Sequence, residues 1–253
     1  MLGQNITKEY LPFEAERQAL ADVAREMFNR KMTNVAGGNI SLKVTPDESF
    51  SYDRQIYEKG RDYLLMTPTF MSEAWYAKMS LSQILVVDLE TGKKLAGEGR
   101  LTREINMHEE AYKANPDIRV VYHSHAPNCM FWATVGMDMP NLTEVTSVNA
   151  PLGRIKCLPY REACSQELAN LVYNELEKLG DEAKENIFLL NSHGVLITDT
   201  DLHAATEVLE TVEWNAEIAY KQTVFKKLGL INEYRSCGKE TNGQVGTSPS
   251  LVE

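Results

Sequence analysis

The chain has 253 residues, of which 43% are hydrophobic and 25% are charged, and its formal net charge is −10. This composition is typical of a globular protein with one sizeable core, and it excludes a fibrous or disordered chain. The negative charge argues against nucleic acid or an anionic membrane as the main partner, because either would require a basic face.

Helical and extended patterns alternate along the chain. From the N-terminus, they predict a helix at 13–31, a strand at 40–44, a polar hairpin at 45–60, and strands at 62–66 and 84–89. They then predict a helix at 104–113, a strand at 118–122, a helix at 126–134, an extended segment near Ile155, a helix at 165–178, a strand at 187–190 and a long helix from about Asp201. Strands interleaved with helices favour an α/β fold in which helices cover both faces of a sheet.

The domain organisation predicted from these patterns is simple. Residues 1–253 are expected to form a single domain, with a polar tail at 236–253 for which disorder and docking on a neighbour are both open. No apolar stretch approaches the roughly 20 residues of a bilayer span, and the N-terminus lacks the regions of a signal peptide. A cytoplasmic location is therefore expected. The four cysteines include no C-x-x-C pair, which favours reduced thiols over disulfides.

Two histidines, His123 and His125, follow the apolar run 118–122. Side chains at positions i and i+2 of a strand point to the same face, so both rings can converge on one ion. His193 follows the apolar run 187–190 in a similar context. Three protein ligands and an open fourth position are typical of catalytic zinc. Each histidine alone would more often be a polar group at a strand end, but together they predict a metal site.

Other polar residues carry weaker signals. Glu104 begins the helix that leads to the histidine-bearing strand, and a carboxylate near a metal could exchange protons with a substrate. An acidic residue in a first helical turn is more often there to complement the helix dipole. The turn 37–39 could present backbone N–H groups to an anion, although many glycine-rich turns bind nothing. His108 and His203, on helices, are expected to have structural or surface roles.

Five segments, NVAGGNIS, LLMTPT, TREINMHEEAYKANPDIRVVYHSHAPNC, KCLPY and FLLNSHGVLI, resemble the class II aldolase/adducin family over about residues 12–228. The resemblance implies a three-layer α/β/α sandwich with a central mixed or antiparallel sheet, commonly assembled as a homotetramer. It implies a divalent metal, zinc or alternatively manganese or cobalt, held by His123, His125 and His193. Glu104 would then stand in the position of the catalytic carboxylate.

The resemblance also implies where a substrate phosphate would bind. The implied phosphate pocket comprises residues from three segments: Gly38, Asn39, Thr67, Thr69 and Thr102. Arg103, which replaces a serine of many members, could pair with a phosphate or carboxylate or simply face solvent. Phe70 stands where an aldolase member has glycine. Glu144 falls near a tyrosine that protonates the leaving fragment, which makes it a second candidate acid.

The function implied by the resemblance is a lyase. A small phosphorylated ketose would undergo retro-aldol cleavage to dihydroxyacetone phosphate and an aldehyde, with Glu104 moving the proton. A sugar-phosphate 4-epimerase and a metal-dependent decarboxylase or dehydratase are alternatives, because the fold does not specify the reaction. Glutamate at position 104 favours the aldolases, since the epimerases have aspartate there. A non-catalytic, adducin-like assembly module is the remaining alternative, and the complete set of histidines with Glu104 argues against it.

Overall fold

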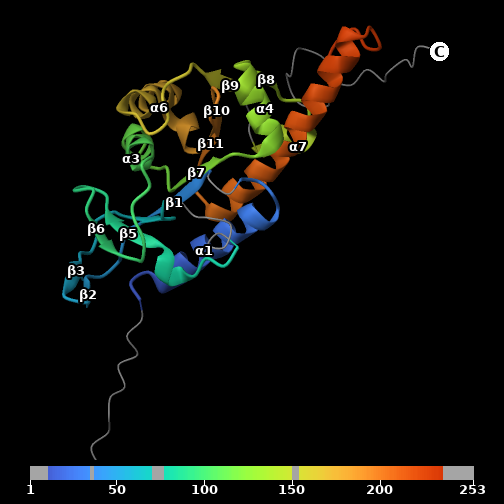
Figure 1. Ribbon diagram of the computed structural model, residues 1–253. Helices are drawn as coiled ribbons and strands as arrows, with labels where there is room; N and C mark the ends of the chain where they lie inside the picture. The colour runs from blue at the N-terminus through green and yellow to red at the C-terminus, as the bar shows by residue number, and fades with distance from the viewer. Residues whose placement is uncertain (1–10, 35–36, 70–76, 150–153, 236–253) are drawn as a thin grey trace, which may run out of the picture.

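A nine-stranded sheet lies at the centre of the computed structural model, which describes residues 11–34, 37–69, 77–149 and 154–235 (Figure 1). Its strand order is β6-β5-β4-β1-β7-β11-β10-β9-β8. The strands are β1 Asn39–Val44, β4 Tyr63–Met66, β5 Leu85–Asp88, β6 Lys94–Ala96, β7 Val120–Ser124, β8 Met139–Pro140, β9 Arg154–Leu158, β10 Asn186–Leu190 and β11 Gly194–Asp199. Strands β9 and β10 are parallel, whereas the other neighbouring pairs are antiparallel. The sheet is therefore mixed, as expected.

Helices cover both faces of the sheet. They are α1 Glu14–Asn29, α3 Ile105–Ala114, α4 Pro127–Val135, α5 Glu144–Asn149, α6 Gln166–Leu179 and α7 Leu202–Lys227, with short 3-10 helices η1 Leu81–Gln83 and η2 Gly180–Lys184. Helices α1, α4 and α7 contribute to one hydrophobic cluster, and α3 and α6 contribute to the other. The predicted three-layer α/β/α sandwich is confirmed.

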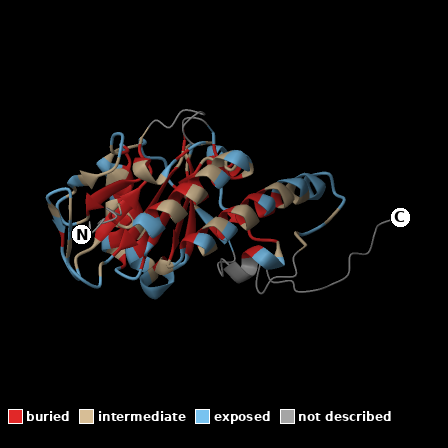
Figure 2. Cartoon of the chain, turned by 90° about the horizontal axis from the view of Figure 1, so that it is seen from below, coloured by how far each residue is buried: buried red, intermediate tan, exposed pale blue. Residues whose placement is uncertain are grey.

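The two cores follow from the alternation of side chains along each strand. In β4, Tyr63 and Leu65 pack toward α1, whereas Leu64 and Met66 pack toward α3. Adjacent residues of a strand point to opposite faces, so a strand covered on both sides is apolar throughout. Figure 2 shows the buried residues concentrated in the sheet and the inner helix faces, while the C-terminal end of α7 projects beyond them and is exposed.

The two predicted helix starts at 165 and 201 are explained by capping side chains. The Ser165 side chain accepts a hydrogen bond from the backbone N–H of Leu168, and Asp201 accepts from those of His203 and Ala204. Such side chains satisfy the N–H groups that a helix leaves unpaired in its first turn. Within the described residues, no helix is both long and apolar enough to cross a membrane.

Some elements were not predicted from the sequence. The predicted hairpin at 45–60 is present as β2 Phe50–Tyr52 and β3 Gln55–Tyr57, but β6, β8, α5 and β11 were missed. Strand β11 matters most, because it lies between β7 and β10 in the sheet. The hairpin from β10 to β11 thus places His193 beside the end of β7. The polar tail and Phe70 lie outside the described residues.

Candidate metal centre

The three predicted ligands come together at one end of the central strands. His123 is in β7, His125 follows that strand, and His193 lies in the turn between β10 and β11. In the sheet, His123 is opposite Asn39 of β1 and Leu196 of β11. Residues separated by more than 70 positions along the sequence therefore become neighbours through strand pairing.

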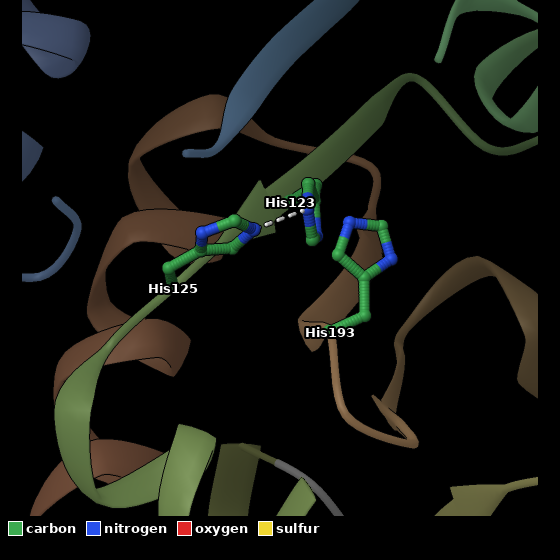
Figure 3. Close-up of side chains that lie close together, drawn as sticks. All are labelled: His123, His125 and His193. Carbon is green, nitrogen blue, oxygen red and sulfur yellow. Dashed lines mark hydrogen bonds between the residues drawn. The ribbon is translucent and has the colours of Figure 1, made fainter. Parts of the chain in front are cut away.

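The histidine rings converge on a common point (Figure 3). The Nε2 atoms of His123 and His125 are 3.1 Å apart. One nitrogen from each of the three histidines lies within 4.8 Å of the others. With zinc–nitrogen bonds of about 2.0–2.1 Å, tetrahedral geometry places ligand atoms roughly 3.4 Å apart. The His123–His125 pair already has this spacing, and small ring movements would let the cluster hold a divalent metal ion.

The protonation of the rings also suits metal binding. His123 Nδ1 lies 3.0 Å from the carbonyl oxygen of Val195, which can only accept, so Nδ1 carries the proton and Nε2 presents its lone pair. Burial holds the pKa of His123 well below its usual value and lowers that of His125 to about 4. His193 Nδ1 is buried and has no hydrogen-bond partner among the described residues. Neutral imidazole is the form that binds a metal.

Glu104 stands directly beside this cluster, at the N-cap position of α3, and is 8% exposed. Its Oε1 lies 2.8 Å from His193 Nε2, and its Oε2 lies 3.7 Å from His123 Nε2. Asn39 Nδ2 donates to Oε2 over 2.6 Å. Burial would raise the pKa of Glu104, but the neighbouring histidines and Asn39 together hold it well below its usual range. The carboxylate is therefore ionised at neutral pH.

Two glycines make room for the histidine rings. A Cβ at Gly37 would lie 1.8 Å from His125 Nδ1, which is far inside van der Waals contact. A Cβ at Gly194 would lie 2.4 Å from the carbonyl oxygen of Ser124 and 2.9 Å from Cε1 of His123. The sequence suggested anion binding by the turn at 37–39, and the structure adds a steric role that sequence reasoning missed.

The predicted phosphate-binding residues lie at the same end of the sheet, with identifiable structural contacts. Thr67 is buried and exchanges two hydrogen bonds of 3.1 Å with the backbone of Ile40, which joins the end of β4 to β1. Thr102 Oγ1 accepts from the backbone N–H of Glu104 over 3.3 Å. The Thr69 N–H donates to the carbonyl of Arg100 over 3.0 Å. Their binding of phosphate stays a prediction.

The remaining predicted site residues differ in exposure. Gly38 has a φ of 81°, a conformation that glycine adopts readily, and it precedes Asn39 at the start of β1. Arg103 is exposed beside Glu104. Glu144 is the exposed first residue of α5, and no hydrogen bond or ion pair among the described residues joins it to the histidines. Its proposed role as an acid stays a prediction.

Comparison with known proteins agrees with the geometry. Residues 18–220 match the family described as class II aldolase and adducin N-terminal domain. The chain is 22% identical over 208 residues to 5-deoxy-D-ribulose 1-phosphate aldolase of Bacillus thuringiensis serovar kurstaki, covering 82% of this chain and 85% of that protein. It is 24% identical over 214 residues to 3-oxo-tetronate 4-phosphate decarboxylase of Haemophilus influenzae, covering 81% and 87%.

The fold is also similar to that of a solved sugar-phosphate aldolase. A solved structure of L-fuculose 1-phosphate aldolase matches with a TM-score of 0.67 and 22% sequence identity, covering 86% of this chain and 90% of that one. Because the family match extends over most of the chain, and the fold likeness extends equally far, this protein belongs to the class II aldolase and adducin N-terminal domain family.

Proposed function

We propose that this protein is a zinc-dependent lyase that cleaves a small phosphorylated ketose to dihydroxyacetone phosphate and an aldehyde. The observation that carries this proposal is the contact between the buried Glu104 carboxylate and the three-histidine cluster. A module used only for assembly would have no need for a buried carboxylate beside three clustered imidazoles, because such a carboxylate is costly to desolvate.

Zinc held by His123, His125 and His193 would act as a Lewis acid, polarising the ketose carbonyl and stabilising negative charge after C–C cleavage. Manganese or cobalt could occupy the same ligands, since imidazole binds several divalent metals. The protein's own contribution is to hold the rings close together and to direct the Nε2 lone pair of His123 at the cluster. The carbonyl of Val195 does this for His123 by accepting its other N–H.

Glu104 is assigned the transfer of the proton at the carbon where the bond is cleaved. Its Oε1 accepts a hydrogen bond from His193 Nε2 over 2.8 Å. That nitrogen cannot serve both a metal and Glu104, so metal binding would free Oε1 from its hydrogen-bond donor. Burial would then raise the proton affinity of the carboxylate, which a general base requires.

The class of substrate is supported by the relatives. The names of the Bacillus aldolase and the Haemophilus decarboxylase each describe a short, phosphorylated keto compound. The decarboxylase also supports a second candidate function, the loss of carbon dioxide from an oxo-acid phosphate. Arg103, exposed beside Glu104, is a candidate partner for the substrate's phosphate or carboxylate in either case.

A substrate panel tests the proposal. Metal-loaded protein is incubated with ketose 1-phosphates, ketose 5-phosphates and oxo-acid phosphates, and the products are identified by mass spectrometry and NMR. Release of dihydroxyacetone phosphate supports the aldolase. Release of carbon dioxide supports the decarboxylase, and an unfragmented epimer supports an epimerase. Every enzymatic proposal would be contradicted if the purified protein contained no stoichiometric metal and His125→Ala did not change its activity.

We further propose that the protein assembles as a homotetramer, as its sequence resemblance implies. Exposed apolar side chains on α4 and α7, including Phe131, Tyr220 and Phe225, offer area for subunit contact. Sedimentation equilibrium should give four times the chain mass of 28.6 kDa. A monomeric mass at micromolar concentration would contradict this assembly.

A further inference from the structure

Two rows of polar side chains face each other between β1 and α3. Glu104, His108 and Tyr112 are spaced four residues apart, so they share one face of the helix. Asn39 and Ser41 are two residues apart and share one face of the strand. All five residues are buried, and His108 and Ser41 are fully inaccessible. Polar groups placed so deeply need hydrogen-bond partners.

A continuous chain of hydrogen bonds links these residues to one another. Asn39 Nδ2 donates to Glu104 Oε2 over 2.6 Å, and Asn39 Oδ1 lies 2.5 Å from Nε2 of His108. On the other side of the ring, His108 Nδ1 lies 2.7 Å from Ser41 Oγ. Ser41 Oγ lies 2.8 Å from the hydroxyl of Tyr112. The chain therefore runs from Tyr112 to the Glu104 carboxylate.

The donors in this chain can be assigned in one direction. The ionised Glu104 can only accept, so Asn39 presents its NH₂ group to it and its oxygen to His108. That oxygen also only accepts, so His108 carries its proton on Nε2. The bare Nδ1 then accepts from Ser41, whose oxygen is left to accept from Tyr112. Each assignment follows from the previous one.

The state of His108 agrees with this assignment. Burial lowers the pKa of His108 to about 4, so the ring is neutral at pH 7 and carries one proton. Tyr112 is buried behind Ser41, and its hydroxyl also lies 3.3 Å from the carbonyl oxygen of Arg119. The phenol has one proton, and the shorter contact to Ser41 takes it, so the carbonyl of Arg119 is only a second, more distant acceptor at the far end of the chain.

The Asn39 amide is oriented from both sides, by the Glu104 carboxylate, which accepts from its NH₂ group, and by His108, which donates to its oxygen. The two ends of an amide have nearly the same shape, so packing alone does not select which end faces Glu104. A donor at His108 Nε2 attracts the Asn39 oxygen and so turns the NH₂ group toward the carboxylate. The opposite orientation would direct an amide oxygen at a carboxylate oxygen, and the two would repel each other.

We propose that His108 is a positioning residue for the Glu104 carboxylate, which it orients through the amide of Asn39. With Oε2 held by Asn39, the carboxylate keeps Oε1 directed at the histidine cluster, where proton transfer is assigned. The catalytic part of this inference rests on the proposed function, whereas the hydrogen-bonded chain does not.

A substrate-free measurement tests the chain itself. Long-range ¹H–¹⁵N spectra of the metal-loaded protein at pH 7 report which ring nitrogen of His108 carries the proton. We expect a neutral ring with the proton on Nε2. A charged ring, or a proton on Nδ1, would overturn the proposal, whether or not the protein turns over any substrate.

Kinetics of two variants test the positioning. His108→Leu removes the donor, whereas the amide of His108→Gln can still donate to Asn39 from a similar position. We expect His108→Leu to lower kcat by about 10- to 100-fold with little change in KM or in metal content, and His108→Gln to recover most of the loss. His203→Leu, at an exposed histidine of α7, is the matched control and should retain wild-type rates.

The outcomes separate this inference from the proposed function. If the wild-type protein is active and His108→Leu keeps its kcat, the positioning role is wrong although the lyase assignment stands. The positioning role is also contradicted if the kcat of His108→Gln is no higher than that of His108→Leu. If the wild-type protein cleaves no ketose phosphate, the proposed lyase function fails. The NMR measurement of the His108 tautomer still tests whether the hydrogen-bonded chain has the assigned donors.

Discussion

The two oxygens of Glu104 have different partners, and this asymmetry organises the site. Oε2 is held by Asn39 at 2.6 Å, whereas Oε1 lies 2.8 Å from the ring of His193. Oε2 is thus fixed by a neighbouring strand, although it also lies 3.7 Å from Nε2 of His123, whereas Oε1 contacts a candidate metal ligand directly. A carboxylate fixed at one end and available at the other is suited to proton transfer, because its orientation is set before the substrate binds.

Glu104→Gln should abolish turnover while the metal stays bound. The amide retains an oxygen for Asn39, but it cannot accept a proton at neutral pH. A loss of at least about 100-fold in kcat is expected, with unchanged metal content by elemental analysis. Glu110→Gln, whose carboxylate pairs with Lys113 at 2.8 Å on the same helix, is the control. Wild-type rates in the Glu104 variant would refute the assigned role.

Gly37→Ala should weaken metal binding without unfolding the protein. The added Cβ would lie 1.8 Å from His125 Nδ1, so the ring must move away from the cluster. We expect about 10- to 100-fold weaker zinc affinity, measured by competition with a chromogenic chelator. Gly60→Ala is the control, since no atom lies within 4 Å of its Cβ, although its φ of 73° costs some stability. Equal zinc affinity in both variants would contradict this steric role.

At the scale of elements, α4 is fixed to α7 through its first turn. Glu213 of α7 is 6% exposed and accepts from the backbone N–H groups of Asn128 and Cys129 at 2.8 and 2.9 Å. These N–H groups lie at the start of α4, where no intrahelical acceptor exists. Because α4 begins just after His125, this contact also restrains the chain that carries a predicted ligand.

Glu213→Ala should lower the free energy of unfolding by about 2 to 3 kcal/mol. The substitution leaves buried N–H groups without an acceptor and removes hydrogen bonds to a charged group. Urea denaturation of the metal-free protein measures the change. Glu217→Ala on the same helix removes an exposed pair with Lys221 and should cost no more than about 0.5 kcal/mol. Similar losses in the two variants would show that the capping contact contributes little.

At the scale of the whole molecule, the three candidate ligands come from segments distant in sequence, so a bound metal would connect these segments. A ligand that binds only the folded state stabilises it by about 3 kcal/mol at 100 times its dissociation constant. Chelator treatment should therefore lower Tm by about 5 to 10 °C, and added zinc should restore it. The Tm of His125→Ala should not respond to chelator. A wild-type Tm that is insensitive to both treatments would contradict the metal site.

Acid should destabilise the folded protein through His108. Burial lowers the pKa of this residue from 6.5 to about 4. Between these two pH values, His108 is protonated in the unfolded chain but neutral in the folded chain. The resulting loss in the free energy of unfolding is absent above about pH 6.5 and grows as the pH falls, reaching about 3 kcal/mol near pH 4.

Urea denaturation between pH 7.5 and 4 measures this effect in chelator-treated protein, so that metal loss does not contribute. His108→Gln cannot titrate, so its free energy of unfolding should fall less steeply with acid than that of the wild type. His203→Leu, which removes an exposed histidine, should follow the wild-type curve. Parallel curves for wild type and His108→Gln would exclude His108 as the source.

Most of the secondary structure could be predicted from local patterns, but β11 could not. Its residues, Gly194–Asp199, are all buried, so the strand shows no alternation of apolar and polar side chains. A short apolar run of this kind is recognised as a strand only when its neighbours in the sheet are known. Those neighbours, β7 and β10, pair with it on either side.

The linear chain was enough to predict which residues make up the candidate site, because the spacing of His123 and His125 and the order of Glu104 and His193 can be read from it. The orientation of these groups could not be predicted in this way, because it depends on contacts made in the folded chain. The contact of His125 with Gly37 and that of His108 with Asn39 join residues far apart in sequence. Strand pairing and helix packing create such contacts, and no local pattern of residues encodes them.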